Sequence, residues 1–347
     1  MTEALLSVRG LVKDFHGRGI GGSRQAVRAV DDVSFDVFPG EALGLVGESG
    51  SGKTTIGRLI VRLEEPTSGR VELRGQDVRG LSGRQLLAYR RDVQMIFQNT
   101  QGAFNPRRTV RSVLTDPYRI HGLASGPELD SRIANLMRRV GLSPDMLDRY
   151  PQQFSGGQRQ RIGIARALSL EPALVVADEP VSALDVSVQA QVLNLFADLR
   201  RELGLSMLFI SHDLRAVYFL CERIAVLYLG RLVEIGPRRT LLEHPAHPYT
   251  RALVGSIPAF RPGGGFTREV IRGEISDSGP VTTGCHFAPR CKLWRELGQP
   301  SRCTQERPPL RPVTGGGVLA ACHFADVPPD GTPEVADTVA GRAGGPA

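Results

Sequence analysis

Short, mostly apolar runs that lead directly into polar residues recur along the chain. Four runs have this form, at Leu43–Val46, Val93–Phe97, Leu174–Ala177 and Met207–Ile210. Runs of this length are typical of strands that are buried on both faces of a parallel sheet. Together with the helical segments between them, they predict an α/β fold with a central sheet. Because ligands of such sheets sit beyond the carboxyl ends of the strands, the polar residues there predict one shared site.

Helical periodicity replaces this pattern between about residues 99 and 158, which predicts an inserted helical subdomain. Apolar residues recur there at helical spacing, at Leu129, Ile133, Leu136 and Val140. Gly141 is placed to end that helix. Further along, Gly230 separates the apolar runs Ile224–Leu229 and Arg231–Ile235, and this predicts a strand pair joined by a tight turn.

Stretches rich in glycine and proline suggest where the chain divides. Residues 16–28 are predicted to form a surface loop, residues 261–284 a linker and residues 325–347 a disordered tail. We expect residues 1–245 to form the α/β domain and residues 246–324 to form a smaller C-terminal region.

Composition and charge are those of a soluble globular protein with a basic surface. Hydrophobic residues make up 41% of the 347 residues, the net charge is +7 and the pI is near 9.5. No apolar run approaches the ~18–20 residues that span a bilayer. The N-terminal residues lack the pattern of a signal peptide, so we expect a cytosolic chain. Neither a basic block nor a nucleic-acid-binding signature is present, which argues against a nucleic-acid partner.

A glycine-rich loop after the first apolar run carries the strongest chemical signal. Its residues are Gly47, Glu48, Ser49, Gly50, Ser51, Gly52, Lys53, Thr54 and Thr55, and they fit the pattern G-x-x-x-x-G-K-[ST]. Backbone N–H groups of such a loop and the positive end of the following helix bind phosphates. Lys53 is one of only three lysines among 43 basic residues, and its compact charge suits a crowded phosphate site better than an arginine. We expect Lys53 to reach the β- and γ-phosphates and the Thr54 hydroxyl to bind Mg²⁺.

Two further groups of residues add chemistry to this loop. Asp178 is placed to hold the magnesium shell, and Glu179 to orient and deprotonate an attacking water. A hydroxyl, two glycines and an amide precede a predicted helix, at Ser155, Gly156, Gly157 and Gln158. They predict a second anion-binding helix N-terminus. A chain with two phosphate-binding elements either binds two nucleotides or presents one element to a partner.

With these motifs in this order, residues 1–245 resemble the ATP-binding-cassette (ABC) ATPases. Gly47–Thr55 corresponds to the Walker A loop, Asp178–Glu179 to Walker B, and Ser155–Gln158 to the signature motif. The resemblance also implies an adenine-stacking aromatic, a Q-loop glutamine, a D-loop aspartate and a switch histidine, at Phe15, Gln98, Asp185 and His212. A place in the hydrophobic core is the alternative for Phe15.

The fold implied by the resemblance is a P-loop ABC ATPase. It would have a RecA-like core, a β-rich N-terminal portion and an inserted helical subdomain, followed by a small Cys-rich extension. It would form a head-to-tail dimer that binds each ATP between Walker A of one chain and the signature motif of the other. Glu179 would be the general base, and His212 would contact the γ-phosphate. Gln98 would join Thr54 and Asp178 at the Mg²⁺ ion.

Four of the five cysteines lie in the C-terminal region, at Cys285, Cys291, Cys303 and Cys322. Cys221 stands apart in an apolar stretch and is predicted to be a core residue. Disulfides are disfavoured in the cytosol. Zinc, a [4Fe–4S] cluster and free thiols remain, although the spacing lacks the close cysteine pairs of structural zinc sites. The segment His247–Thr250 and the Cys-rich tail resemble the C-terminal extension of dipeptide and oligopeptide importer ATPases, in particular the F-type subunit. That group carries a [4Fe–4S] cluster on four such cysteines, so the resemblance implies the cluster, with zinc as the alternative.

ATP hydrolysis coupled to import of dipeptides or oligopeptides is the function implied by the resemblance. The partners would be two transmembrane permease subunits, a second ABC ATPase subunit and an extracytoplasmic peptide-binding protein. The chain would lie on the cytoplasmic face of the plasma (inner) membrane. An importer of nickel or another small solute with the same architecture is an alternative. A soluble ABC ATPase that acts on nucleic acid or ribosomes is another, although the chain has one cassette and no sustained heptads.

Overall fold

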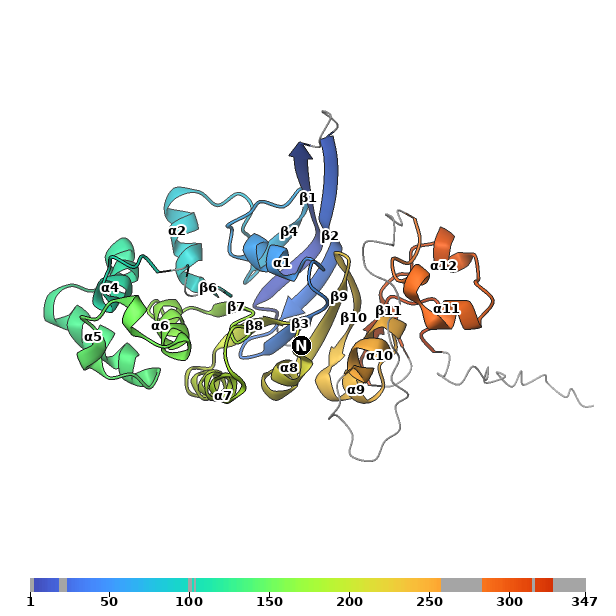
Figure 1. Ribbon diagram of the computed structural model, residues 1–347. Helices are drawn as coiled ribbons and strands as arrows, with labels where there is room; N and C mark the ends of the chain where they lie inside the picture. The colour runs from blue at the N-terminus through green and yellow to red at the C-terminus, as the bar shows by residue number, and fades with distance from the viewer. Residues whose placement is uncertain are drawn as a thin grey trace, which may run out of the picture.

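The structure is a computed structural model, and it describes residues 3–18, 24–98, 102, 104–256, 283–313 and 316–326. Figure 1 shows a central sheet between a helical part, with α4 to α6, and a C-terminal part, with α10 to α12. The predicted linker and tail lie mostly outside the described residues. The domain boundaries given above therefore stay predictions.

An eight-stranded mixed sheet forms the centre of the molecule, in the order β11-β12-β10-β9-β3-β8-β7-β6. Its parallel strands are β3 (Ala42–Val46), β6 (Val93–Ile96), β7 (Leu174–Asp178), β8 (Ser206–Ser211) and β9 (Arg223–Tyr228). Four of them coincide with the apolar runs of the sequence, which confirms the predicted sheet. Strands β3, β7 and β8 are buried along their whole length.

Alternate residues of these strands point to two separate cores, as the two-residue period of a strand requires. In β8, for example, Met207 and Phe209 join one core, whereas Leu208 and Ile210 join the other. The helices that contact the sheet strands include α1 (Lys53–Ile60), α2 (Gly83–Asp92), α6 (Gly156–Leu168), α8 (Leu214–Leu220) and α9 (Arg238–Glu243). Helix α7 (Val186–Leu203) packs against α6 and α8.

A second, antiparallel sheet has the order β2-β1-β4-β5. Its strands are β1 (Leu6–Arg18), β2 (Arg24–Val37), β4 (Ser68–Leu73) and β5 (Gln76–Asp77). The prediction of a surface loop over residues 16–28 was wrong at both ends, because β1 continues to Arg18 and β2 begins at Arg24. The reason is cross-strand pairing, with Gly17 opposite Gln25 and Arg18 opposite Arg24, which overrides the glycine-rich composition.

The region between β6 and β7 is helical, as predicted. It contains α4 (Val110–His121), α5 (Gly126–Arg139), the short 3₁₀ helices η1 (Pro144–Met146) and η2 (Pro151–Gln153), and α6. Helix α5 ends before Gly141, which adopts the left-handed conformation with φ +71°. In Figure 1 these helices lie beyond the β6 edge of the main sheet.

The C-terminal part is joined to the opposite edge of the same sheet. It follows β10 (Arg231–Pro237) with α9 (Arg238–Glu243), α10 (Pro248–Gly255), η4 (Ala288–Arg290), α11 (Lys292–Glu296), α12 (Arg302–Gln305), β11 (Arg311–Pro312) and β12 (Leu319–Ala320). Strand β12 pairs antiparallel with β10, which in turn pairs with β9 through the turn at Gly230. The predicted strand pair around Gly230 is confirmed.

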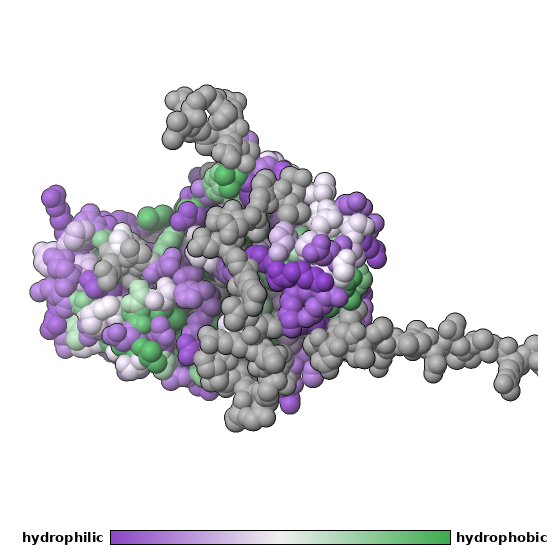
Figure 2. All heavy atoms as spheres, turned by 45° about the vertical axis from the view of Figure 1, so that its right-hand side comes forward, coloured by the Kyte–Doolittle hydropathy of each residue, from purple (hydrophilic) through white to green (hydrophobic). Residues whose placement is uncertain are grey.

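Most large apolar side chains lie in the cores, and the fifth cysteine, Cys221, is fully buried there. On the face shown in Figure 2, hydrophobic residues form small, separate patches among hydrophilic ones. Among the described residues, no helix is both long and apolar enough to cross a bilayer.

Candidate active site

The glycine-rich loop connects the buried strand β3 to helix α1, as its motif requires. Lys53 is the first residue of α1, and its side chain turns back under the loop. The Lys53 ammonium donates hydrogen bonds to the carbonyls of Gly47 at 2.8 Å and Glu48 at 2.9 Å. The loop therefore wraps around the ammonium group and holds its charge at the N-terminus of α1.

Two loop glycines are required by close approach of other backbone. A Cβ atom at Gly47 would lie 2.1 Å from the Leu227 carbonyl oxygen, and one at Gly52 would lie 2.3 Å from that of Ala29. Gly52 also has φ +100°, which side-chain-bearing residues rarely adopt. The turn at Gly230 also contacts the loop, because the Gly230 N–H donates a hydrogen bond to the Ser51 carbonyl at 2.9 Å.

An open cavity with about 460 Å³ of space for water lies over this loop. It is lined by the loop and α1 residues Ser49, Gly50, Ser51, Gly52, Lys53, Thr54 and Thr55, and by Ala29, Gln98, Glu179 and His212. Lys53 is 5% exposed, and burial lowers its pKa, whereas the nearby carboxylates of Glu179 and Asp178 oppose this shift. A buried cation under a glycine-rich loop at a helix N-terminus is suited to bind the phosphates of a nucleoside triphosphate.

Asp178 and Thr54 lie side by side at the end of β7 and the start of α1. The Thr54 hydroxyl donates to Asp178 Oδ1 at 3.0 Å. Asp178 is buried, and this desolvation raises its pKa, although the Thr54 hydrogen bond opposes the change. A hydroxyl and a carboxylate next to a phosphate-binding loop are the oxygen donors that suit a hydrated Mg²⁺ ion. The residues therefore fit the ion that the sequence predicts.

Glu179 is the centre of the third group. Gln98 Nε2 donates to Glu179 Oε2 at 2.9 Å, and His212 Nδ1 lies 3.2 Å from Glu179 Oε1. These three residues follow β6, β7 and β8, so the carboxyl ends of neighbouring parallel strands bring them together as predicted. Glu179 has φ +44°, a conformation that costs a side-chain-bearing residue about 1–3 kcal/mol and is concentrated at functional sites.

Phe15 is exposed on β1, which excludes the core position. It is 38% exposed and does not line the cavity within the described part of the chain. The Lys13 ammonium lies 4.9 Å from the centre of its ring. Val27, 61% exposed, is the cross-strand partner of Phe15 on β2, and Ala29 on the same strand lines the cavity. Sequence reasoning missed Val27 and Ala29, because only the strand register connects them to the loop.

The signature residues lie at the N-terminus of α6. The Ser155 hydroxyl accepts from the Gln158 N–H at 3.3 Å, and Gln158 Oε1 accepts from the Ser155 N–H at 3.0 Å. This reciprocal cap orders the helix start. Gly157 is close to Val188 of α7, since a Cβ atom there would lie 2.4 Å from Val188 Cγ1.

Asp185 is the residue before α7, and its side chain makes no capping hydrogen bond to the described start of the helix. The next residue, Val186, is 83% exposed. Within the described residues, neither Asp185 nor the segment 155–158 lines the cavity over the glycine-rich loop. One chain therefore does not bring its two anion-binding helix starts into one site.

Known proteins share this arrangement. Residues 30–182 match the family described as ABC transporter, and residues 233–296 match the oligopeptide/dipeptide transporter C-terminal region. A relative from Brucella ovis, named as a peptide import ATP-binding protein, is 48% identical over 91% of this chain and 97% of its own length. The chain belongs to the ABC transporter ATP-binding proteins.

Other comparisons agree with this ABC ATPase assignment. The oligopeptide transport ATP-binding protein AppF of Bacillus subtilis is 43% identical over 93% of this chain and 98% of its own length. The structure of the dimeric cassette MJ0796, bound to ADP and Pi, has a TM-score of 0.59 and 30% identity. The match covers 67% of this chain and 99% of the MJ0796 chain. The predicted fold class is confirmed for the cassette, and the chain is an ATPase of this family.

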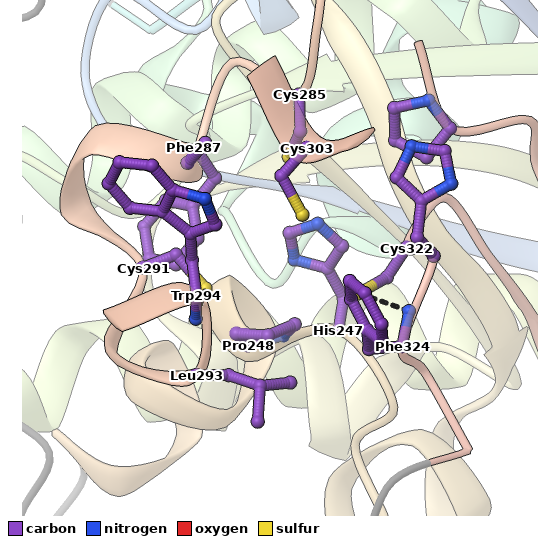
Figure 3. A pocket seen from close by; sticks show the side chains of 13 residues that line it. His247, Pro248, Cys285, Phe287, Cys291, Leu293, Trp294, Cys303, Cys322 and Phe324 are labelled. Carbon is purple, nitrogen blue, oxygen red and sulfur yellow. Dashed lines mark hydrogen bonds between the residues drawn. The ribbon is translucent and has the colours of Figure 1, made fainter. Parts of the chain in front are cut away.

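The four C-terminal cysteines of this ABC ATPase line one cavity, together with apolar residues and two histidines, His247 and His323 (Figure 3). The Trp294 N–H donates to Cys291 Sγ and the Phe324 N–H to Cys322 Sγ, each at 3.4 Å. Burial raises the pKa of both thiols to about 12. The sequence prediction that these cysteines share one place is consistent with this cavity.

His247 adds a polar atom to the cysteine cavity. Its Nδ1 accepts from the Tyr249 N–H at 3.0 Å, and burial lowers its pKa to about 3. The neutral ring therefore carries its proton on Nε2, which has no hydrogen-bond partner among the described residues. In Figure 3 the ring lies between Cys303 and Cys322. An N–H donor among four thiols fits an anionic sulfur-containing group.

No set of three or more His, Cys, Asp or Glu residues in the described chain is gathered closely enough to hold a single metal ion. The cysteine arrangement therefore does not match a ready single-ion zinc site. The arrangement of the described residues therefore gives no support to either metal group that the sequence suggested, the [4Fe–4S] cluster or zinc.

Proposed function

We propose that this chain is the ATP-hydrolysing subunit of an importer of dipeptides or oligopeptides. The observation that carries the proposal is the union of two features in one chain. One is the cavity lined by Lys53, Thr54 and Glu179, whose charges and donors suit a nucleotide's terminal phosphates. The other is the match of residues 233–296 to the oligopeptide/dipeptide transporter C-terminal region.

The charged and polar residues at the cavity have separate roles in hydrolysis. Lys53 and the loop N–H groups bind the β- and γ-phosphates, and Thr54 and Asp178 hold Mg²⁺, with Gln98 beside them. When bound, Mg²⁺ neutralises charge on the phosphate oxygens. Glu179 accepts a proton from the attacking water, and His212 and Gln98 hold its carboxylate toward the γ-phosphate.

The signature motif acts on a second subunit. Ser155–Gln158 and Asp185 lie away from the cavity of their own chain, and a reciprocal cap orders Ser155 and Gln158. This suits the motif to close the cavity of a facing cassette. The dimeric state of the related cassette MJ0796 supports this arrangement. Phe15, with Val27 opposite, supplies the exposed apolar surface on which an adenine base would stack.

Transport requires partners that this chain does not supply. We propose two transmembrane permease subunits, a second ABC ATPase subunit and an extracytoplasmic peptide-binding protein, with this chain on the cytoplasmic face of the membrane. The test is uptake of a labelled dipeptide by cells that carry either the wild type or Lys53→Ala. Lys53→Ala is expected to abolish uptake and leave the amount of protein unchanged. Normal uptake by that variant would refute the proposal.

We further propose that Cys285, Cys291, Cys303 and Cys322 hold a [4Fe–4S] cluster. Their shared cavity and the free Nε2–H of His247 support this. Protein purified without oxygen is expected to be brown, with broad absorbance near 400 nm. The same preparation of Cys303→Ser is expected to lose this colour. A colourless wild type containing stoichiometric zinc would refute the cluster.

A further inference from the structure

One residue of the Walker A loop, Glu48, is held at each of its polar groups. Its N–H donates to the Tyr249 hydroxyl at 2.9 Å, and its carbonyl accepts from the Lys53 ammonium at 2.9 Å. Its carboxylate oxygen Oε2 lies 3.1 Å from Arg290 Nη1. A loop whose glycines leave it conformationally free is thus fixed at Glu48 from three directions.

Two of these three contacts come from the C-terminal part of the chain. Tyr249 is on α10, and Arg290 ends η4 immediately before Cys291. The Arg290 side chain is 8% exposed and also donates to the Tyr228 hydroxyl at 3.3 Å. Because the pair is largely withdrawn from water, its charge-assisted hydrogen bond is stronger than one on the surface.

Aromatic packing holds both residues in place. The rings of Tyr228 and Tyr249 have centroids 4.7 Å apart, and Phe287 packs against them at 5.3 Å and 5.5 Å. Phe287 lies two residues after Cys285 and lines the cysteine cavity. A continuous packed path therefore runs from the cysteine cavity to the Walker A loop.

We propose that Arg290 and Tyr249 are positioning residues for ATP, acting through Glu48. The inference rests on the proposed ATPase function of the site. Neither residue lines the nucleotide cavity within the described chain, so their effect is on the shape of the loop. Held by them, the loop presents its N–H groups to the phosphates without first losing conformational freedom.

The experiment compares Arg290→Gln with Arg311→Gln in full-length protein. Arg311 is a matched control, since it pairs with Asp326 at 2.9 Å in the same C-terminal part but touches no loop residue among those described. Arg290→Gln is expected to raise the KM for ATP about 5- to 10-fold and to leave kcat within about twofold, the pattern of lost uniform binding. Arg311→Gln is expected to match the wild type, and Arg290→Lys to recover part of the affinity.

A double-mutant cycle with Glu48→Gln separates action through Glu48 from a direct effect of positive charge on ATP. In the Glu48→Gln background, Arg290→Gln is expected to change KM less than about twofold. A full 5- to 10-fold effect in that background, or none in the wild type, overturns the proposal. Should Arg290→Gln fail to fold, Glu48→Gln removes the same ion pair from the loop side and is expected to raise KM equally. Lys53→Ala is measured in the same assay as a control for the ATPase site. If the wild type binds ATP no more tightly than Lys53→Ala, the proposed ATPase function itself is refuted, not only the role of Arg290.

Discussion

Replacing Glu179 with glutamine separates proton transfer from every other property of the site. Both contacts of the carboxylate survive the change. The carbonyl of the new amide can accept from Gln98 Nε2, which lies 2.9 Å from Oε2 of the glutamate. Its NH₂ can donate to His212 Nδ1, which lies 3.2 Å from Oε1, in the tautomer that carries the ring proton on Nε2. We therefore expect the free energy of unfolding to change by less than about 1 kcal/mol.

Hydrolysis is expected to fall far more, because an amide cannot take a proton from water. Loss of a positioned general base costs about 10²- to 10⁴-fold in rate, or about 3–5 kcal/mol in the activation barrier. ATP binding is expected to persist, since Lys53 and the loop are untouched. The assay is phosphate release at saturating Mg-ATP, with ATP affinity from a titration and dimer formation from size-exclusion chromatography. We expect the variant to trap an ATP-bound dimer. A variant that keeps more than about a tenth of the wild-type rate would show that Glu179 is not the base.

Three further substitutions test other parts of the site. Gly52→Ala places a Cβ atom 2.3 Å from the Ala29 carbonyl, so we expect it to lose ATP binding and more than about 2 kcal/mol in a urea titration. Gly75→Ala, with similar φ and open space around it, is the control and should lose only about 1–2 kcal/mol. Asp178→Asn should abolish Mg²⁺-dependent hydrolysis yet raise the metal-free Tm at pH 7.5. Burial raises the Asp178 pKa above 3.8, so its contribution to stability is present below 3.8 and lost as pH rises through the raised pKa. An unchanged or lower Tm would contradict this. Phe15→Ala should weaken ATP binding about 5- to 10-fold through lost stacking, with Phe15→Trp near wild type; equal affinity of all three proteins would exclude stacking.

The sequence is sufficient to predict four parallel strands of the central sheet, because these buried strands are short, mostly apolar runs that lead into polar residues. It also predicts the residues that gather at the strand ends, such as Lys53, Glu179 and His212. It fails where pairing, not composition, decides the conformation, as between Arg18 and Arg24. Contacts of the Walker A loop with Tyr249 and Arg290 span 201 and 242 residues along the chain, so no local pattern could indicate them.

The pairing of β12 with β10 means that the C-terminal part is not a detachable module. A protein shortened to the cassette alone would leave β10 as a bare edge strand with unpaired N–H and carbonyl groups, which invites pairing with other chains. Transfer of the C-terminal part onto another cassette therefore requires transfer of the β10–β12 strand pairing as well as the cysteines.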